Sequence, residues 1–418
     1  MKIKTMDLPY DKVVEKKPHR HKLPVAPMLP IRMLLKAISK PELKETQFTC
    51  EKTGMEKLPA NQPALFLMNH SCFTDLKIAF SELYPRKFNI VCTSDGFVGK
   101  ESIMRMAGCI PTKKFITDVT LVKDILYAVH KLHNSILMYP EASYSFDGTA
   151  TTLPDSLGKL VKKLKIPVIM IKTAGAFSRD PLYNMLQLRK VKISAVMKYL
   201  MSPEEIENKS VSEINDIIKE QFTFDNFRWQ IENDVKITEK FRADGLNRVL
   251  YKCPCCGKEG KMLGKGTAIT CTECNEKWEL NENGSLSGKV FNHVPDWYKW
   301  ERECVREEIE NGTYSLDIPV DIKMLVDSKA LYSVGSGRLT HSQDGFHLTG
   351  CEGKLDYTHT PAKSYSLYAD YYWYEIGDMI CIGDTKALYY CFPKTEGDIV
   401  AKTRLASEEL FKKIKRKN

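Results

Sequence analysis

Short apolar runs alternate with segments of helical periodicity between residues 46 and 248, and this alternation restricts the fold more than any other feature. The runs have the length of buried strands rather than of membrane spans. Helical periodicity fills stretches between them, such as residues 120–133 and 156–164. The pattern predicts an α/β domain with a mostly parallel sheet over residues 46–248. The five expected strands are Ala64–Met68, Phe88–Ser94, Ser135–Tyr139, Pro167–Gly175 and Lys192–Leu200.

The remaining segments differ in composition from this domain. The chain has 418 residues, which is long for a single ordinary domain. Residues 1–45 are rich in Lys and Pro and predict a basic, partly amphipathic arm with one helix between Pro30 and Pro41. Residues 285–418 are rich in aromatics and hairpin signals. They predict a β-rich domain, a small sandwich or barrel closed by a helix near residues 398–415, which loosely resembles a pleckstrin-homology module.

Positive charge is concentrated at the two ends of the chain. Residues 1–44 carry a net +7 and residues 412–418 a net +5, whereas the whole chain carries +9, so the remainder is slightly acidic. Basic ends on an acidic body fit an anionic membrane surface, and solvated, frayed ends are the alternative. A nucleic-acid partner is not expected, because a nucleic-acid-binding face would lie in the body of a domain.

The start of the chain has no apolar core of a signal peptide, and no apolar run reaches the length of a membrane span. These features predict a cytoplasmic protein that is peripheral on the inner face of the membrane.

Two Cys-x2-Cys pairs lie fourteen residues apart, in a Gly- and Lys-rich segment that predicts a zinc ribbon over residues 249–284. Four thiolates at this spacing suit tetrahedral Zn²⁺, and a site closed by four sulfurs is structural rather than catalytic. Cys255 is a fifth thiol that could replace a neighbour. Nucleic-acid contact is the alternative role of such a ribbon. The expected ligands are Cys253, Cys256, Cys271 and Cys274.

The segment NHSCFTD, residues 69–75, follows the first expected strand. Its His70 and Asp75 can meet where the strand opens into a helix. The carboxylate would then hold one imidazole nitrogen and leave the other as a base for a hydroxyl. The alternative is a structural histidine next to an Asp that caps the helix.

Three further segments follow in order. GCIPTKK, residues 108–114, places two cations, Lys113 and Lys114, in an expected loop after a glycine. YPEASYS, residues 139–145, follows an expected strand, so Glu141 lies at the carboxyl end where α/β sheets bind ligands. KIPVIMIKTAG, residues 165–175, begins a strand near Pro167.

In this ordered set the chain resembles the glycerolipid acyltransferase family, typified by 1-acyl-glycerol-3-phosphate acyltransferase. The family's Asn-His-x4-Asp block is matched in full by residues 69–75. In its second block Lys114 or Lys113 stands where the family has Arg. In the third, Phe-Pro-Glu-Gly-Thr-Arg-Ser, the chain reads Tyr-Pro-Glu-Ala-Ser-Tyr-Ser, with Tyr144 in the Arg place. The fourth, an apolar run around Pro-Val, is matched at residues 166–168.

The resemblance implies acyl transfer from an acyl thioester, of CoA or acyl carrier protein, to the hydroxyl of a lysophospholipid or of a glycerol-phosphate-type acceptor. His70 would be the general base and Asp75 would orient it. The resemblance places the second-block cation on the acceptor phosphate and Glu141 with its neighbours at the acceptor. The substrate-binding residues that follow are Asn69, Lys113, Lys114, Glu141, Ala142, Ser143 and Pro167.

The chain departs from the family where two arginines would bind phosphate. Lys114 can act as a point charge, but Tyr144 cannot, so two bidentate forks are missing. A different lysolipid, or a hydroxyl without a phosphate, remains open as the acceptor. A catalytically degenerate scaffold that binds a lipid or protein through the ribbon and the β-rich domain is the rival interpretation.

Overall fold

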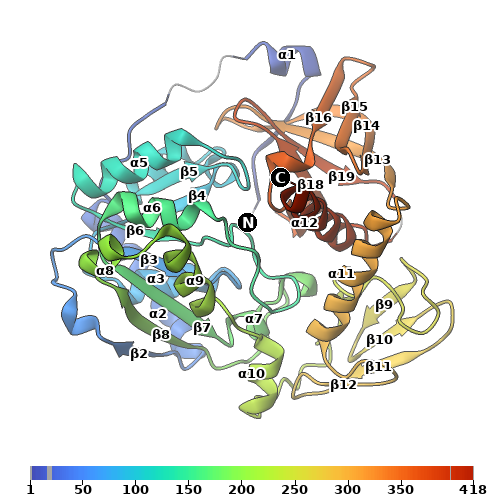
Figure 1. Cartoon of the computed structure of the whole chain (residues 1–418), viewed down its shortest axis with the longest axis horizontal. Coiled ribbons are helices and arrows are strands. Elements are labelled where there is room, and N and C mark those ends of the chain that lie inside the picture. Colours follow the sequence, from blue (N-terminus) through green and yellow to red (C-terminus); the bar gives the residue numbers. More distant parts are fainter. Residues whose placement is uncertain (1, 17–20, 396, 418) are drawn as a thin grey trace.

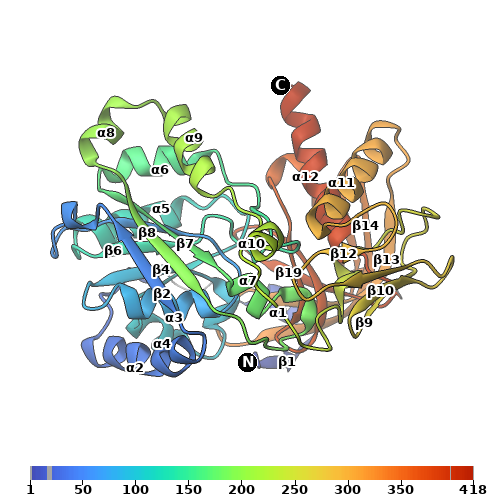
Figure 2. The ribbon, with the colours of Figure 1, turned by 90° about the horizontal axis from the view of Figure 1, so that it is seen from below.

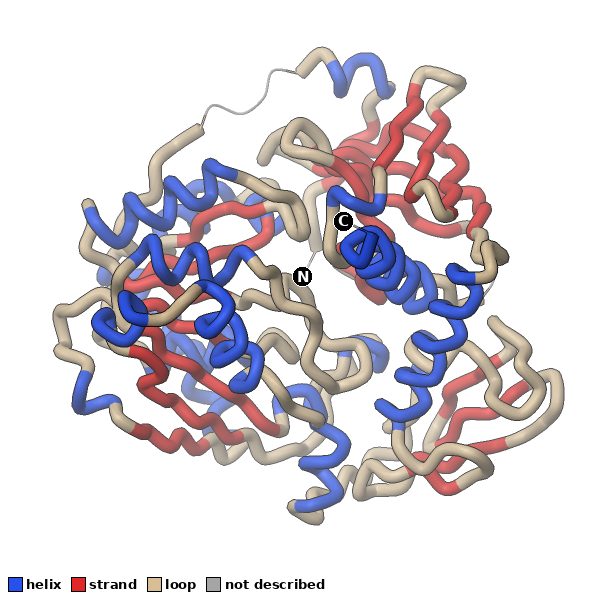
Figure 3. Tube along the Cα trace, in the orientation of Figure 1, coloured by secondary structure: helices blue, strands red, loops and turns tan. Residues whose placement is uncertain are grey.

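The computed structural model describes residues 2–16, 21–395 and 397–417. Three groups of strands divide the chain, as Figure 3 shows in red. The α/β sheet with its helices lies on one side of the molecule, and the C-terminal sheet lies on the other, next to a small ribbon (Figure 1). No helix within the described residues is long and apolar enough to cross a membrane.

A seven-stranded sheet forms the α/β part, in the order β2-β8-β7-β3-β6-β4-β5. Every neighbouring pair is parallel except β7 and β8, so the expectation of a mostly parallel sheet is confirmed. All five expected runs are strands. The bounds are β2 Thr49–Thr53, β3 Leu65–Met68, β4 Phe88–Thr93, β5 Cys109–Thr112, β6 Ser135–Met138, β7 Val168–Ala174 and β8 Ser194–Met201.

Helices cover both faces of this sheet (Figure 2). Alternate side chains of β3 point to opposite faces, as strand geometry requires. Leu65 and Leu67 pack with α5, α6 and α9, whereas Phe66 and Met68 pack with α2 and α3. The helix bounds are α2 Leu29–Glu45, α3 Thr74–Glu82, α4 Glu101–Met106, α5 Val119–His130, α6 Ser156–Leu164, α7 Ala176–Arg179, α8 Pro203–Asn208, α9 Val211–Gln221 and α10 Asn226–Glu232.

The edge strands were not expected from the sequence. β2 is polar and largely exposed, and β5 contains Pro111, which suits an edge because proline cannot donate to a ladder. The expectation that residues 108–114 form a loop is therefore wrong for β5. The expected strands β3, β6 and β7, by contrast, are apolar because they are buried between helices, whereas β8 alternates buried and exposed side chains.

Helix α2 is longer than the sequence suggested, because it continues through Pro41 to Glu45. A proline inside a helix removes one backbone hydrogen bond and usually ends the helix. Here Leu43 is buried against the sheet side and Ser39 is fully covered, so packing holds the last turn in place. The expected helix between Pro30 and Pro41 is correct in type and wrong in its end.

The N-terminal residues join the C-terminal sheet. Strand β1 (Thr5–Asp7) pairs in parallel with β14, and helix α1 (Tyr10–Val14) buries Val13 in the same hydrophobic cluster. The first residues of the basic arm are therefore part of a folded sheet, and α1 lies beside the C-terminal strands (Figure 1).

The C-terminal sheet has the order β16-β15-β14-β13-β19-β18-β17, with β1 added to β14. Its strands form one hydrogen-bonded path in which every neighbouring pair is antiparallel except β1 and β14, and helix α12 packs against β17 and β18. The β-rich region with a final helix is as expected from the sequence. The bounds are β13 Leu316–Leu325, β14 Leu331–Ser342, β15 Gly345–Gly350, β16 Leu355–His359, β17 Tyr368–Trp373, β18 Gly377–Gly383, β19 Leu388–Pro393 and α12 Val400–Lys417.

A four-stranded ribbon and helix α11 (Val294–Glu310) connect the two large sheets. Trp278 of the ribbon and Trp297 of α11 are both fully buried, with ring centroids 4.7 Å apart. They belong to one apolar cluster that continues into the C-terminal sheet. The ribbon strands are β9 Met262–Lys265, β10 Ala268–Cys271, β11 Lys277–Leu280 and β12 Leu286–Ser287.

Candidate active site

Four adjacent parallel strands deliver polar side chains to one edge of the α/β sheet. Strands β3, β6, β4 and β5 are neighbours, and His70, Glu141, Asp95 and Lys114 follow their carboxyl ends. Ligands bind at this edge in α/β sheets because the loops there converge. Pro167 precedes β7 and is buried at the opposite edge, so the structure does not bring it to His70.

The loop from β3 to α3 positions His70 against Asp75. The Nδ1 atom of His70 lies 3.2 Å from Oδ2 of Asp75. The same oxygen accepts hydrogen bonds from the backbone N–H groups of Ser71 at 2.7 Å and Cys72 at 3.1 Å. Asp75 lies in the first turn of α3, where the positive end of the helix dipole favours a carboxylate. The pair therefore assigns the ring proton to Nδ1 and leaves Nε2 as an acceptor.

The His70 ring is held in a mainly aromatic environment. Its centroid is 4.0 Å from that of Tyr139, in a stacked arrangement, and 4.3 Å from that of Tyr144. The side chain is 16% exposed, so one part of the ring remains accessible. Burial lowers the pKa of His70, against the hydrogen bond and charge of Asp75, which raise it. The neutral imidazole, the form able to accept a proton, is thereby favoured.

The loop after β6 fixes the backbone of His70 on both sides. The His70 N–H donates to Oε2 of Glu141 at 2.9 Å, and the His70 carbonyl accepts from the Ser145 N–H at 3.2 Å. Oε1 of Glu141 accepts from the N–H and hydroxyl of Thr151. Burial raises the pKa of Glu141 to about 7, although these hydrogen bonds oppose the rise. In this structure Glu141 holds His70 in place and is fully buried.

Asn69 links the end of β3 to β7. Its amide nitrogen donates to the Thr173 carbonyl at 3.2 Å, and its side-chain oxygen accepts from the Thr173 N–H at 2.8 Å. The residue is fully buried. Both ends of the carboxamide are thus used within the protein, next to the Asp75 carboxylate, which lies 3.5 Å from the Thr173 hydroxyl.

Ala142 and Ser143 shape the turn that carries Glu141. Ala142 has a φ of 57°, in the left-handed region that favours glycine, and its N–H donates to the Tyr139 carbonyl. The Ser143 hydroxyl donates to the Tyr144 carbonyl at 3.3 Å. These contacts are internal to the loop and bring Tyr144 against His70.

The two lysines after β5 point to different partners. Lys113 donates to the carbonyls of Asp384 and Thr385, in the turn between β18 and β19. The Lys114 ammonium lies 4.1 Å from the centroid of the Tyr368 ring. Its charge helps to lower the pKa of His70. Of the two cations, Lys114 is the one that faces the candidate active site.

Residues 49–172 match the family model of the acyltransferases. An acyltransferase domain occupies this part of the chain. It contains His70, Asp75, Glu141 and Lys114, and it ends within β7.

A search of curated proteins returned no match. Among solved structures, the chain is similar to the 1-acyl-sn-glycerophosphate (LPA) acyltransferase PlsC from Thermotoga maritima. The identity is 13% and the TM-score 0.38, over 46% of this chain and 77% of that one.

Residues of the C-terminal region reach the acyltransferase domain at this edge. The Tyr368 hydroxyl donates to Asp95 at 2.5 Å and accepts from Trp373 Nε1 at 2.9 Å. Arg404 of α12 donates to the Tyr144 carbonyl at 3.4 Å. Sequence reasoning missed these residues, since they lie more than two hundred positions from their partners. The aromatic density of residues 365–374 was the only local signal.

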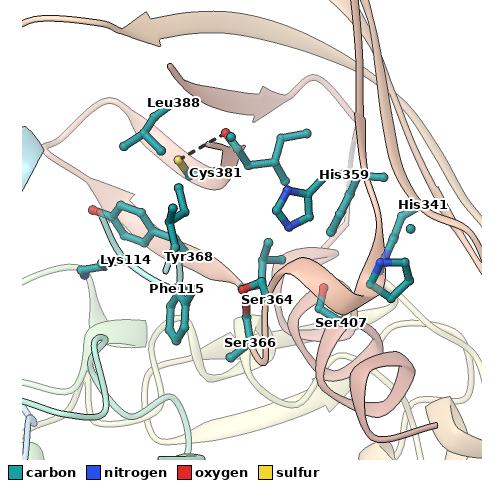
Figure 4. A pocket seen from close by; sticks show the side chains of 17 residues that line it. Lys114, Phe115, His341, His359, Ser364, Ser366, Tyr368, Cys381, Leu388 and Ser407 are labelled. Carbon is teal, nitrogen blue, oxygen red and sulfur yellow. Dashed lines mark hydrogen bonds between the residues drawn. The ribbon is translucent and has the colours of Figure 1, made fainter. Parts of the chain in front are cut away.

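A small cavity of about 30 Å³, room for a water-sized molecule, lies between Lys114 and the C-terminal sheet. Figure 4 shows Lys114 and Phe115 on the side of the acyltransferase domain and His341 and His359 on the side of the C-terminal strands. Burial lowers the pKa of His341 to about 3 and that of His359 to about 4. Both imidazoles are therefore neutral near pH 7.

The four cysteines expected as metal ligands form one cluster. Their sulfur atoms all lie within 4.8 Å of one another, with 3.7 Å between Cys253 and Cys274 and between Cys256 and Cys271. A tetrahedral ion at about 2.3 Å from each sulfur requires sulfur atoms roughly 3.8 Å apart. The cluster therefore fits a metal ion such as zinc. Cys255 is exposed and lies outside the cluster.

Proposed function

We propose that the protein is an O-acyltransferase that moves a fatty acyl group from a thioester, of CoA or acyl carrier protein, to a lysophospholipid-type hydroxyl. The observation that carries this proposal is the 3.2 Å contact between His70 and Asp75 within an acyltransferase domain. The contact leaves Nε2 of a neutral imidazole as the free base. His70 lies at the carboxyl edge of the sheet, where α/β proteins bind ligands, so the donor and the acceptor can both bind next to it.

The proposed reaction needs no covalent enzyme intermediate. His70 Nε2 takes the proton of the acceptor hydroxyl while the hydroxyl oxygen attacks the thioester carbonyl carbon. The carbon–sulfur bond then breaks, and the leaving thiolate takes the proton from the imidazolium. Asp75 stabilises the transient positive charge through Nδ1. A positioned base contributes about 10²- to 10⁴-fold, and alignment of the two substrates supplies much of the remainder.

The decisive experiment measures thiol release by the purified protein. Acyl-CoA and acyl carrier protein are the donors, and a panel of lysolipids and glycerol 3-phosphate supplies the acceptors. His70→Ala is expected to lower the rate by at least about 100-fold. His130→Ala, at the exposed end of α5, is the matched control and should retain the rate.

A catalytically degenerate scaffold is the second candidate. The His70 side chain is only 16% exposed, and α12 contacts the loop that holds it, which favours a site closed by the C-terminal region. If the wild type and His70→Ala release thiol at the same rate, the protein is the scaffold and not an acyltransferase that uses His70.

Helix α2 supports a peripheral position on an anionic membrane, on its inner face. Met33, Leu34 and Ile38 are 54%, 59% and 56% exposed, and Lys40 is exposed beside them. An apolar stripe with a basic flank is suited to a membrane interface. The opposite side of α2 packs on its own domain through Leu43.

Vesicle sedimentation tests the membrane proposal. The wild type should bind phosphatidylglycerol vesicles more strongly than phosphatidylcholine vesicles, and Met33→Ser with Leu34→Ser and Ile38→Ser should reduce both. If the variant with these three serines binds both kinds of vesicle as strongly as the wild type does, α2 is not the membrane contact.

We also propose that the four-cysteine cluster holds structural zinc. Four sulfur ligands leave no open coordination position, so the ion would take no part in acyl transfer. Cys253 to Cys274 would instead fix the ribbon, whose Trp278 packs on α11 and so joins the two large sheets.

A further inference from the structure

We propose that Arg404, from the C-terminal helix α12, acts with Lys114 to bind the phosphate group of the acceptor beside His70. This inference rests on the proposed acyl transfer and specifies its acceptor as a lipid with a phosphate group. It also assigns the C-terminal region a direct part in the site of the acyltransferase domain.

Arg404 is buried but weakly paired. Its side chain is 4% exposed, and its guanidinium lies 4.4 Å from the centroid of the Phe146 ring. Nη1 donates to the Tyr144 carbonyl at 3.4 Å and Nε to Glu408 at 3.4 Å. Both distances exceed those of strong charge-assisted hydrogen bonds, which are about 2.7–2.9 Å. Nη2 has no acceptor among the described residues, so the planar fork keeps donors for a ligand.

Lys114 is the second cation of the site. Within the described part of the chain its ammonium has no hydrogen bond or ion pair, only the Tyr368 ring at 4.1 Å. Burial lowers the pKa of Lys114, and the nearby charge of Arg404 lowers it further. Arg404 is buried and Lys114 is partly buried, and their charges repel, so a phosphate would relieve this repulsion and restore lost solvation.

The nearby carboxyl groups do not fully balance the two cations. Asp370 faces Lys114, but burial raises its pKa to about 7, so it is partly protonated at neutral pH. Asp95 accepts a hydrogen bond from Tyr368. Glu408 is 2.7 Å from Arg302 and accepts from the Ser366 hydroxyl at 2.7 Å. Glu408 is thus shared between the guanidinium groups of Arg302 and Arg404, and Asp370 is partly protonated, so these two carboxyl groups do not fully balance Lys114 and Arg404.

Tyr144 connects this pair to the catalytic histidine. Its ring centroid is 4.3 Å from that of His70, and its carbonyl accepts from Arg404. The charge of Lys114 in turn lowers the pKa of His70. A phosphate held by both cations would therefore place the rest of the acceptor, with its hydroxyl, near the imidazole.

Three other cations are engaged elsewhere. Lys113 donates to Asp384 and Thr385. Lys172 donates to the Thr223 carbonyl at 2.8 Å. Arg179 pairs with Glu42 and Glu45 at 3.6 and 3.5 Å. Arg404 is thus the guanidinium best placed for an acceptor anion, although it lies 260 positions from Tyr144 along the chain.

The test compares two acceptors of the same chain length, lysophosphatidate with a phosphate and monoacylglycerol without one. Arg404→Gln should raise KM for lysophosphatidate about 10- to 100-fold, as expected for a lost charge-assisted contact, and should leave KM for monoacylglycerol unchanged. Arg404→Lys should give an intermediate KM. Arg306→Gln is the control, since Arg306 pairs with Glu409 on the neighbouring helix and should affect neither acceptor.

Equal losses for both acceptors, or a fall in thermal stability that Arg404→Lys does not restore, would show a purely structural role and overturn the inference. Calorimetric titration with glycerol 3-phosphate separates the two proposals. If the wild type binds it and Arg404→Gln does not, the anion site stands even when no acyl transfer is seen. If the wild type does not bind it, the anion site is wrong whatever the acyl-transfer result.

Discussion

The Nδ1 atom of His70 lies 3.2 Å from Oδ2 of Asp75, and two backbone N–H groups donate to the same oxygen. This geometry gives Asp75 a role in orientation rather than in proton transfer. Asp75→Asn should lower kcat by about 10²- to 10⁴-fold, because an amide nitrogen facing Nδ1 would favour the wrong tautomer. The measurement is steady-state thiol release. A variant with normal kcat would show that the carboxylate serves folding alone.

The pH profile of kcat/KM should report a depressed histidine pKa. Burial lowers the pKa of His70, so the neutral base should persist as the pH falls through the usual histidine value of about 6.5. Activity is then lost only on further acidification. Asp75→Asn should shift the acid limb to still lower pH, because Asp75 raises the pKa of His70. A limb at 6.5 or above in the wild type would contradict the burial argument.

Glu141 is the control for this profile, since burial raises its pKa to about 7. An apparent pKa near 7 that disappears in Glu141→Gln would belong to that carboxyl group. The limb that remains in Glu141→Gln would then belong to His70.

The left-handed backbone at Ala142 predicts a stabilising substitution. A side chain at φ 57° is strained by about 1–2 kcal/mol, and glycine removes the strain at an entropic cost of about 0.5–1 kcal/mol. Ala142→Gly should therefore raise the free energy of unfolding by up to about 1.5 kcal/mol, as measured by denaturant titration. Ala107→Gly, at a φ of −77°, is the control and should give no gain. A loss of stability in Ala142→Gly would mean that the turn tolerates the methyl group without strain.

The sequence predicted those parts of the fold that depend on local pattern. Strands β3, β6 and β7 are apolar because they are buried on both faces, and they were recognised together with β4 and β8. The edge strands β2 and β5 carry polar residues or Pro111 and lack that pattern. The end of α2 was misplaced, because contacts of Leu43 outweigh the effect of Pro41.

The candidate site divides in the same way. His70 and Asp75 are five positions apart, so their contact follows from a strand that opens into a helix. Lys113 and Lys114 are adjacent in the sequence, but Lys113 contacts Asp384 and Lys114 contacts Tyr368. Both partners belong to the C-terminal region, so the sequence alone could not assign them. Arg404 approaches from a distant helix, and no spacing in the sequence predicts such a contact.

The geometry of the cysteine cluster predicts one metal ion per chain. Cys253→Ser and Cys271→Ser each remove one of four sulfur ligands and should abolish stoichiometric zinc, as measured by elemental analysis of the purified protein. Thermal stability should fall with the metal, because the ribbon packs through Trp278 on α11. Cys255→Ser is the matched control, since this thiol is exposed and outside the cluster. Zinc lost in Cys255→Ser as well would show that the fifth thiol replaces one of the four.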